Sequence, residues 1–546
     1  MTQPSGSGRN RSQVQTFRVS SVSASGGTYT VGVSPSIYMP NWSTARSATL
    51  TWNDRTYNGT GVGIENMTIF YSGSSSVNFD ITMGNTYASW VKGVRFVGAP
   101  VISPLNVSGS KNALVSNNYF FSNLVLNGTY PPAMQTDTSS DTLILNNIMT
   151  SGVPWEGNGG ITGLVFAYNY GRDTFTLYNE NSTFDHHGYS SFELFEGNQM
   201  GQMLEDATWG THNLNTYFRN YVPCWDAPYN TFTSAGVPRG IAIDRYHRFT
   251  NLVGNAIGTA SQCSTYQGDY NAIGSIFRID TYDPLVSSTL FRWGNATVAK
   301  QAGDSPANSG VRFLASEVPS TLSSALASLS NVVPQDTSLP CSMFFPSGTS
   351  CTPSYGGGSG LNWWNVCTSW SSFPTSCAGS QAQPFPMAGP EVVNGPYVNG
   401  HAYDIPAAVA WLNLPIDTSL QNSYTVTSSS WANGVMTLTV AGLPAGSVHI
   451  MGPFQLAGVS SACMAGATVG ASNELLMTGS NASTVSYALP SNPGTGCTGT
   501  MKFPDVRQFD ERVYQSDSGT PISGGLPAGG GGTGIAPPAG LVASVR

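Results

Sequence analysis

The chain has 546 residues, of which only 9% are charged, and its formal net charge is −8. Because the chain is acidic and contains no run of basic residues, nucleic acid is not expected as a partner. It contains no stretch of about 18 apolar residues, so no membrane span is predicted. The 62 glycines, the 34 prolines and the lack of a sustained helical apolar period favour an all-β protein.

Residues 1–60 are polar and contain short alternating stretches. The stretches at 15–19 and 29–33 place apolar residues at every second position, as strands do. We therefore predict an N-terminal β segment over 1–60.

Residues 61–300 carry a repeat in which short apolar runs end in asparagine. Intervals of 29, 22, 29, 22, 35 and 40 residues separate the terminal asparagines. This pattern predicts a right-handed parallel β-helix in which one asparagine per turn stacks at an inward corner and hydrogen-bonds to the next turn. The longer intervals indicate loops inserted at the corners, which would build the functional surface. The asparagines are Asn118, Asn147, Asn169, Asn198, Asn220, Asn255 and Asn295.

Three further regions follow the repeat. Residues 301–415 are irregular and rich in Pro, Cys and Trp, which is typical of a disulfide-rich covering segment. Residues 416–515 alternate again and predict a small β-sandwich-like module. Residues 516–546 form a Gly/Pro linker tail whose last residues resemble the opening strand of a fibronectin-type domain, so further domains are expected beyond it.

Eight cysteines, an even number, predict disulfides and an oxidising compartment. Cys224 is expected to pair with Cys263, and Cys463 with Cys497. The pairing among the middle four is left open by the sequence. No Cys/His spacing suits zinc, so no metal or cofactor is predicted, and no motif indicates calcium. The middle four are Cys341, Cys351, Cys367 and Cys377.

Several segments resemble those of a large group of secreted bacterial right-handed β-helix proteins, which is similar in fold to the pectate-lyase superfamily and mostly uncharacterised. They occur in the same order as in that group: 38–42 (YMPNW), 193–198 (ELFEGN), 209–212 (WGTH), 292–295 (RWGN) and 400–406 (GHAYDIP). The resemblance implies the fold and a secreted or cell-surface location. Residues 1–20 contain no apolar signal core, so an export signal is expected outside this chain. The group's pattern more often has a second histidine after His212, where this chain has Asn213.

The densest set of ionisable residues lies between residues 185 and 219. Successive turns of a β-helix stack about 4.8 Å apart, so a carboxylate can meet a histidine or arginine of the next turn for acid–base work. For each of these residues the alternative is a structural ion pair or packing role. The predicted catalytic residues are Glu205, Asp206 and His212, with Arg219 and Arg245 as partners of substrate charge. The predicted substrate-binding residues are Trp209, Tyr217, His186 and Glu193.

The first functional hypothesis is therefore an extracellular polysaccharide-active enzyme, a lyase or a glycoside hydrolase. The alternative is a non-catalytic surface or appendage protein that binds cell-surface glycans, and a phage tailspike is a lesser alternative. A β-helix supports all three. Carboxylate, His and Arg groups converging in an open groove would favour the enzyme, and a flat polar and aromatic face would favour binding.

Overall fold

The structure is a computed structural model of the chain. It describes residues 13–39, 42, 48–51, 59–71, 77–122, 131–172, 183–224, 239–258, 263, 265–299, 311–319, 333–334, 339, 343–344, 405–443, 453–469, 472–481 and 483–509. The four middle cysteines (Cys341, Cys351, Cys367 and Cys377) and the predicted linker 516–546 lie outside these residues.

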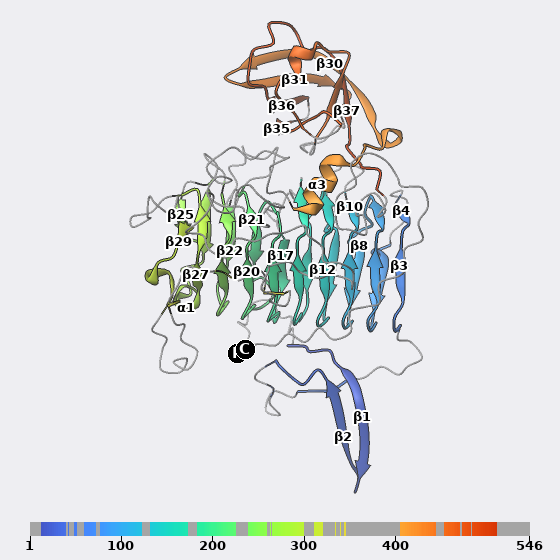
Figure 1. Cartoon of the computed structure of the whole chain (residues 1–546), viewed down its shortest axis with the longest axis vertical. Coiled ribbons are helices and arrows are strands. Elements are labelled where there is room, and N and C mark those ends of the chain that lie inside the picture. The colour runs from blue at the N-terminus through green and yellow to red at the C-terminus, as the bar shows by residue number, and fades with distance from the viewer. Residues whose placement is uncertain are drawn as a thin grey trace, which may run out of the picture.

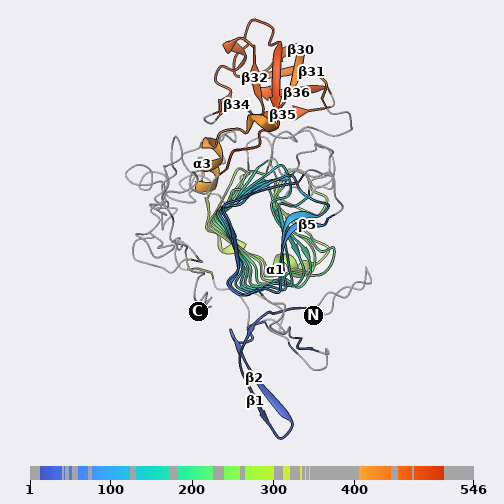
Figure 2. The ribbon, with the colours of Figure 1, turned by 90° about the vertical axis from the view of Figure 1, so that its right-hand side faces the viewer.

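The chain forms a parallel β-helix, as the sequence predicts, with short strands of successive turns stacked into parallel sheets (Figures 1 and 2). The first sheet contains β3 (Gly63–Glu65), β6 (Trp90–Lys92), β9 (Leu114–Ser116), β12 (Leu143–Leu145), β15 (Val165–Ala167), β18 (Leu194–Glu196), β20 (Thr216–Phe218), β23 (Asn251–Val253) and β27 (Phe291–Trp293). The second face has two runs: β4 (Thr68–Phe70), β7 (Arg95–Val97), β10 (Tyr119–Phe121), β13 (Ile148–Thr150) and β16 (Tyr170–Arg172), then β21 (Tyr221–Val222), β24 (Ala256–Ile257), β28 (Asn295–Thr297) and antiparallel β29 (Val311–Arg312). The third sheet contains β5 (Phe79–Gly84), β8 (Ser103–Ser108), β11 (Met134–Asp137), β14 (Glu156–Asn158), β17 (Thr183–His187), β19 (Met203–Glu205), β22 (Arg239–Ile243), β26 (Ser275–Ile279) and β25 (Thr265–Gly268).

The asparagine ladder is confirmed at all seven predicted positions. Each side-chain Nδ2 donates to the Oδ1 of the next asparagine, at 2.9 to 3.1 Å, from Asn118 through Asn295. The same Oδ1 accepts the backbone N–H of the preceding asparagine. The ladder therefore satisfies the polar groups of a corner that is closed to water.

The residue before each ladder asparagine turns the corner with a positive φ. Glycine adopts this conformation freely at Gly197 and Gly254, and asparagine does so at Asn117. Tyr168 (φ 57°) and Arg219 (φ 53°) adopt it with larger side chains. The corner is thus set by the turn geometry, and the side chain at this position remains available for other contacts.

The central residue of each first-sheet strand points into the coil. Val115, Ile144, Phe166 and Phe195 belong to one buried cluster, and the Phe195 ring stacks on Tyr217 with centroids 4.7 Å apart. The flanking strand residues point outward because side chains alternate along a strand. Described parts of the C-terminal half cover them. The helix α3 (Pro406–Asn413) packs there, and a second buried cluster includes Val318 and Leu339. The short helices α1 (Pro284–Thr289) and η4 (Ala315–Glu317) lie beside β27, at the end of the coil where the repeat stops.

Beyond η7 (Thr418–Leu420), a six-stranded antiparallel sheet forms a separate module on one side of the coil (Figure 1). Buried Arg507 pairs with Glu474 of this module, and its backbone N–H donates to Tyr119 Oη of the coil at 3.0 Å. This contact fixes the module to the β-helix. The module consists of β30 (Asn422–Ala432), β31 (Val435–Ala441), β32 (Gln455–Ala457), β35 (Met477–Ser480), β36 (Thr484–Ala488) and β37 (Gly499–Phe503), with η8 (Ser461–Cys463) and a small pair, β33 (Thr468–Val469) with β34 (Glu474–Leu475).

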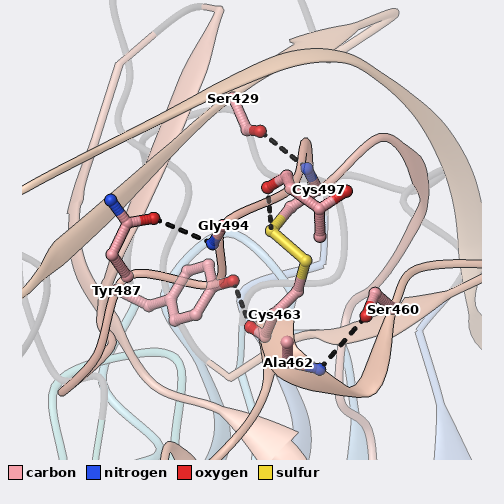
Figure 3. The surroundings of a disulfide bond; sticks show 9 residues. Ser429, Ser460, Ala462, Cys463, Tyr487, Gly494 and Cys497 are labelled. Atoms are coloured by element: carbon pink, nitrogen blue, oxygen red, sulfur yellow. Dashed lines mark hydrogen bonds between the residues drawn. A yellow bond between two sulfur atoms is a disulfide. The ribbon is translucent and has the colours of Figure 1, made fainter.

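The two predicted disulfides are present. Cys224 is bonded to Cys263 within the interior cluster of the coil, and Cys463 is bonded to Cys497 inside the module. Tyr487 Oη donates to the Cys463 carbonyl at 2.5 Å, and the Cys497 N–H donates to Ser429 Oγ at 2.8 Å (Figure 3). The second disulfide therefore joins η8 to the segment before β37, and these hydrogen bonds hold it against β36 and β30.

A hairpin of β1 (Arg18–Ser25) and β2 (Thr28–Ser34) projects from the side of the coil opposite the module (Figures 1 and 2). Its base is fixed to the coil, where Tyr38 Oη donates to Asp141 Oδ1 at 3.0 Å and the Thr16 N–H donates to Ser140 Oγ at 2.8 Å. Within the described residues, no helix is long and apolar enough to cross a membrane.

Candidate functional site

The predicted catalytic residues lie around the third sheet, where consecutive residues face opposite ways. Glu205 pairs in register with Ile243, which pairs with Ile279, and both isoleucines belong to the interior cluster. Glu205 therefore points into the coil. The next residue, Asp206, points outward because side chains alternate.

On the outside, Asp206 begins a row of aspartates with one residue per turn. The N–H of Asp244 donates to Glu205 O, and that of Asp280 donates to Ile243 O, each at 3.1 Å, which stacks the three carboxylates in sequence. Burial raises the pKa of Asp244 to about 6, although it is ion-paired with Arg278. We call this row and its neighbours the outer strip; its members are Glu156, His186, Asp206, Trp209, Asp244, Arg245, Tyr270, Arg278, Asp280 and Tyr282.

His186 lies in the middle of the outer strip, with both ring nitrogens engaged. Its Nδ1 lies 2.5 Å from Asp206 Oδ2, and its Nε2 accepts from Trp209 Nε1 at 2.9 Å. Because an indole N–H can only donate, this network assigns the proton to Nδ1 and leaves the imidazole neutral. The other oxygen of Asp206 accepts the Thr208 N–H at 2.9 Å.

Arg245 and two tyrosines form one end of the outer strip. The Arg245 Nε donates to Asp280 Oδ2 at 2.7 Å, and the guanidinium carbon lies 4.6 Å from the Tyr282 ring centre and 5.5 Å from that of Tyr270. Arg278 lies 4.8 Å from the Tyr270 ring on the same side of the coil. Tyr282 is 72% exposed and Tyr270 is 42% exposed, so both rings remain open to a ligand.

Glu156 lies towards the other end, near His186 and one turn before it. Its Oε2 accepts from Gln135 Nε2 at 2.8 Å. Burial raises the pKa of the Glu156 carboxyl, and the hydrogen bond from Gln135 opposes that shift. Glu156 is therefore a protonatable acid beside a histidine–aspartate pair.

Inside the coil, Asn215 joins three buried carboxyl groups. Its Nδ2 lies 3.0 Å from Glu193 Oε2, 3.2 Å from Glu205 Oε1 and 3.3 Å from Asp185 Oδ2. The Glu193 N–H donates to Asn215 Oδ1 at 3.1 Å, which fixes the orientation of the amide. An amide nitrogen has two hydrogens for these three acceptors, so the cluster is stable only if protons are shared among the carboxyl groups.

The pKa values in this interior polar cluster follow from burial. Burial raises the pKa of Asp185 to about 6 and that of Glu205 to about 7, and the pKa of Glu193 is raised well above its usual value. Thr250 Oγ1 donates to Glu205 Oε2 at 3.1 Å, which partly offsets the cost of a charge there.

His212 belongs to the same interior cluster. Its Nδ1 lies 3.2 Å from Asp185 Oδ2, and its ring stacks on His247 of the next turn with centroids 4.9 Å apart. Both histidines are fully buried. They lie where Ser139 and Ser190 lie on earlier turns, since each of these residues precedes its ladder asparagine by eight positions (147 − 139, 220 − 212).

The structure separates the predicted residues into three places. Glu193, Glu205, His212 and Tyr217 lie inside the coil, and His186, Asp206, Trp209 and Arg245 lie on the outer strip. Arg219 belongs to neither, because it lies at the corner of the first sheet near Glu196, where burial lowers its pKa to about 10. These contacts place Asp206 and Arg245 on the outer strip, His212 inside the coil and Arg219 at the corner, so the predicted catalytic residues do not share one groove.

Sequence reasoning missed Glu156, Asn215, His247 and the two strip tyrosines. The repeat itself carried part of the signal: Glu193, Asn215 and Thr250 each precede a ladder asparagine by five positions, which predicts that they stack (198 − 193, 220 − 215, 255 − 250). Tyr270 and Tyr282 lie in a long interval without such a register, and nothing in their local sequence marks them.

Among the described residues, no group of three or more His, Cys, Asp or Glu side chains has a geometry that could hold a metal ion.

No family model and no curated protein matches the chain. Among solved structures, PfbA, a surface adhesin of Streptococcus pneumoniae, is similar at 12% identity with a TM-score of 0.23, over 41% of this chain and 65% of the adhesin chain, which is less than two thirds of its length. HetL, a pentapeptide repeat protein of Nostoc sp. strain PCC 7120, is similar at 7% identity with a TM-score of 0.12, over 40% of this chain and 87% of that chain.

Proposed function

We propose that this protein is an extracellular β-helix protein that binds a polysaccharide or cell-surface glycan along the outer strip without cleaving it. The observation that carries the proposal is the open end of the strip, where Tyr282 and Tyr270 flank Arg245 and Arg278. Sugar-binding sites combine aromatic faces, which pack on the C–H faces of sugar rings, with planar charged groups that hydrogen-bond to hydroxyls.

The lateral arrangement suits a polymer. Asp206, Asp244 and Asp280 occupy consecutive turns, so the strip extends along the coil axis with a repeat of about 4.8 Å. A linear chain laid along this axis would meet similar polar groups at each turn. The arginines beside the aspartates favour a neutral or weakly acidic glycan over a strongly charged one.

The burial of the acid–base candidates supports binding over catalysis. A general acid or base must come within hydrogen-bond reach of the proton that it transfers. Glu205 and His212 are 0% exposed, and the lone pair of His186 Nε2 is occupied by Trp209. The two disulfides support an extracellular location, because such bonds persist in oxidising compartments.

A second candidate, polysaccharide lyase or hydrolase activity, is favoured by one observation. Glu156 has a raised pKa next to the His186–Asp206 pair, and the side chains of Glu156 and His186 are partly accessible. If Trp209 moved aside on substrate binding, Glu156 would serve as the acid and His186 as the base.

Affinity electrophoresis through gels that contain single polysaccharides, neutral and acidic, tests the proposal. We expect retardation by at least one glycan and a loss of at least about tenfold in affinity, about 1.4 kcal/mol, for Tyr282→Ala. Phe70→Ala is the matched control, since Phe70 is 50% exposed on the first coil, away from the strip. Absence of retardation in every gel would reject binding. If the chain instead releases new reducing ends or unsaturated products from a polysaccharide, and Glu156→Gln loses this activity, the enzyme hypothesis replaces the binding proposal.

A further inference from the structure

The projecting hairpin has an apolar face and a polar face. Val22 pairs with Val31 and Ala24 pairs with Tyr29, and cross-strand partners share a face. The opposite face carries the pairs Ser23 with Thr30 and Ser25 with Thr28. Such strict alternation is typical of a strand pair with one buried face.

A β-bulge extends the apolar face to the base of the hairpin. Val19 and Val22 are three residues apart and would face opposite ways in a regular strand. The register shifts between Val19 and Ser21, so that Val19 pairs with Val33 and joins the side of Val31. The bulge thus completes an apolar face of five large or medium side chains: Val19, Val22, Tyr29, Val31 and Val33.

No described residue outside the hairpin pairs with either of its strands, and the apolar face is open to solvent. Val22 is 61% exposed, Tyr29 is 72% exposed and Val19 is 45% exposed. An isolated two-stranded hairpin is marginally stable in water, and exposed apolar sheet faces of soluble proteins mark interaction sites. The hydrogen bonds at the base, from Thr16 and Tyr38, present the hairpin in a fixed place.

We propose that this face packs against the same face of a second copy of the chain, forming a four-stranded, two-layer sandwich about a two-fold axis. Residues 13–34 contain one charged residue, Arg18, so like faces do not repel each other and no charged partner is indicated. A two-fold axis near Val22 and Val31 would lay Tyr29 at the turn of one hairpin over Val19 at the base of the other. Because the hairpin projects away from the coil and the module, two copies can meet without a clash between their coils (Figures 1 and 2).

The expected dimer is weak. Each copy contributes only one face of a two-stranded hairpin, so we expect a Kd on the order of 10 to 100 μM. On a surface that displays many copies, such an interface would link neighbouring molecules through their hairpins.

Sedimentation analysis of the whole chain over a concentration series tests the proposal. We expect a monomer–dimer equilibrium that Val22→Glu with Val31→Glu weakens at least tenfold. The matched control, Ser23→Glu with Thr30→Glu, adds the same charges to a neighbouring pair on the polar face and should leave the equilibrium within about twofold. A monomer at every concentration, or equal loss in both double variants, overturns the proposal.

A second measurement covers the case in which the glutamate variants unfold the hairpin. Val22→Cys should be cross-linked to its copy by a short bis-maleimide, because the two-fold axis places the two thiols opposite each other across sheets about 10 Å apart. Ser23→Cys, on the opposite face, should remain monomeric. Equal cross-linking of both variants also overturns the proposal.

Discussion

Asn198 and Asn220 are 22 residues apart, and Asn198 donates two hydrogen bonds to the same oxygen atom of Asn220. Asn220 Oδ1 accepts the side-chain Nδ2 of Asn198 at 2.9 Å and its backbone N–H at 3.0 Å. The other hydrogen of Asn198 Nδ2 is donated to Phe166 O at 2.8 Å, one turn back. One side chain therefore couples three turns of the coil.

Asn198→Leu should destabilise the coil strongly. The substitution removes the acceptor of the Asn169 N–H groups and the donor to Phe166 O, in a corner without water. Each buried group left without a partner costs about 1–3 kcal/mol. Chemical denaturation should show this loss, whereas Asn251→Leu, which removes one half-exposed bond to Thr216, should change stability by less than about 1 kcal/mol. Similar losses in both variants would contradict the ladder's structural role.

The ladder could be predicted from sequence because its signal is local: an apolar run that ends in asparagine once per turn. The site could not be predicted to the same depth, because adjacent residues on a strand face opposite ways. Glu205 and Asp206 are neighbours in sequence, yet one enters the interior cluster and the other joins the outer strip. Arg219 has a third environment because a positive φ turns the chain just after β20. One residue of register decides between these outcomes.

Stability should fall as the pH rises from about 4 to about 7. The carboxyl groups of Asp185 and Glu205 have folded-state pKa values of about 6 and about 7, above their unfolded values, and the pKa of Glu193 is raised as well. The folded state therefore binds more protons than the unfolded state in this window. The stabilisation from these protons is complete below the pKa values of the unfolded chain and is lost as the pH rises through those of the folded chain. We expect a decline on the order of a few kcal/mol in the free energy of unfolding.

Glu193→Gln is the corresponding variant. Its amide oxygen can still accept from Asn215, but the side chain cannot ionise. We expect denaturation curves of the variant to depend less on pH between about 4 and 7 than those of the parent chain. An unchanged slope would show that the interior cluster does not govern the pH dependence.

Glu196 should hold the covering segment against the first sheet. Its Oε2 accepts the backbone N–H groups of Met343 at 2.8 Å and Phe344 at 3.2 Å. Glu196→Ala leaves these donors without their acceptor, so we expect faster hydrogen exchange at both amides and a loss of about 1–3 kcal/mol. Glu65→Ala, at an exposed edge of the first coil, is the control and should leave exchange at residues 343 and 344 unchanged.

Removing the Cys463–Cys497 disulfide should destabilise the C-terminal module. The bond closes a loop with a sequence separation of 34 residues, and the loss of this constraint on the unfolded chain corresponds to about 3–4 kcal/mol. We expect the double substitution of both cysteines by serine to lower the calorimetric transition of the module and to leave that of the coil in place. A single transition that moves as a whole would show that the Arg507 contact couples the two parts into one folding unit.

Asp206→Asn distinguishes a structural from a functional role for the outer strip. The new side chain can still accept the Thr208 N–H through its oxygen, but its amide group would face the Nδ1–H of His186, donor against donor. If His186 moved its proton to Nε2 in response, it would lose the bond from Trp209. We therefore expect a change in Trp209 fluorescence and a loss of about 1–2 kcal/mol in stability, while Asp137→Asn, on an earlier turn of the same sheet, should leave the Trp209 fluorescence unchanged. If a polysaccharide is cleaved by the parent chain and Asp206→Asn abolishes turnover with stability unchanged, the pair is catalytic, and the binding proposal gives way to the enzyme.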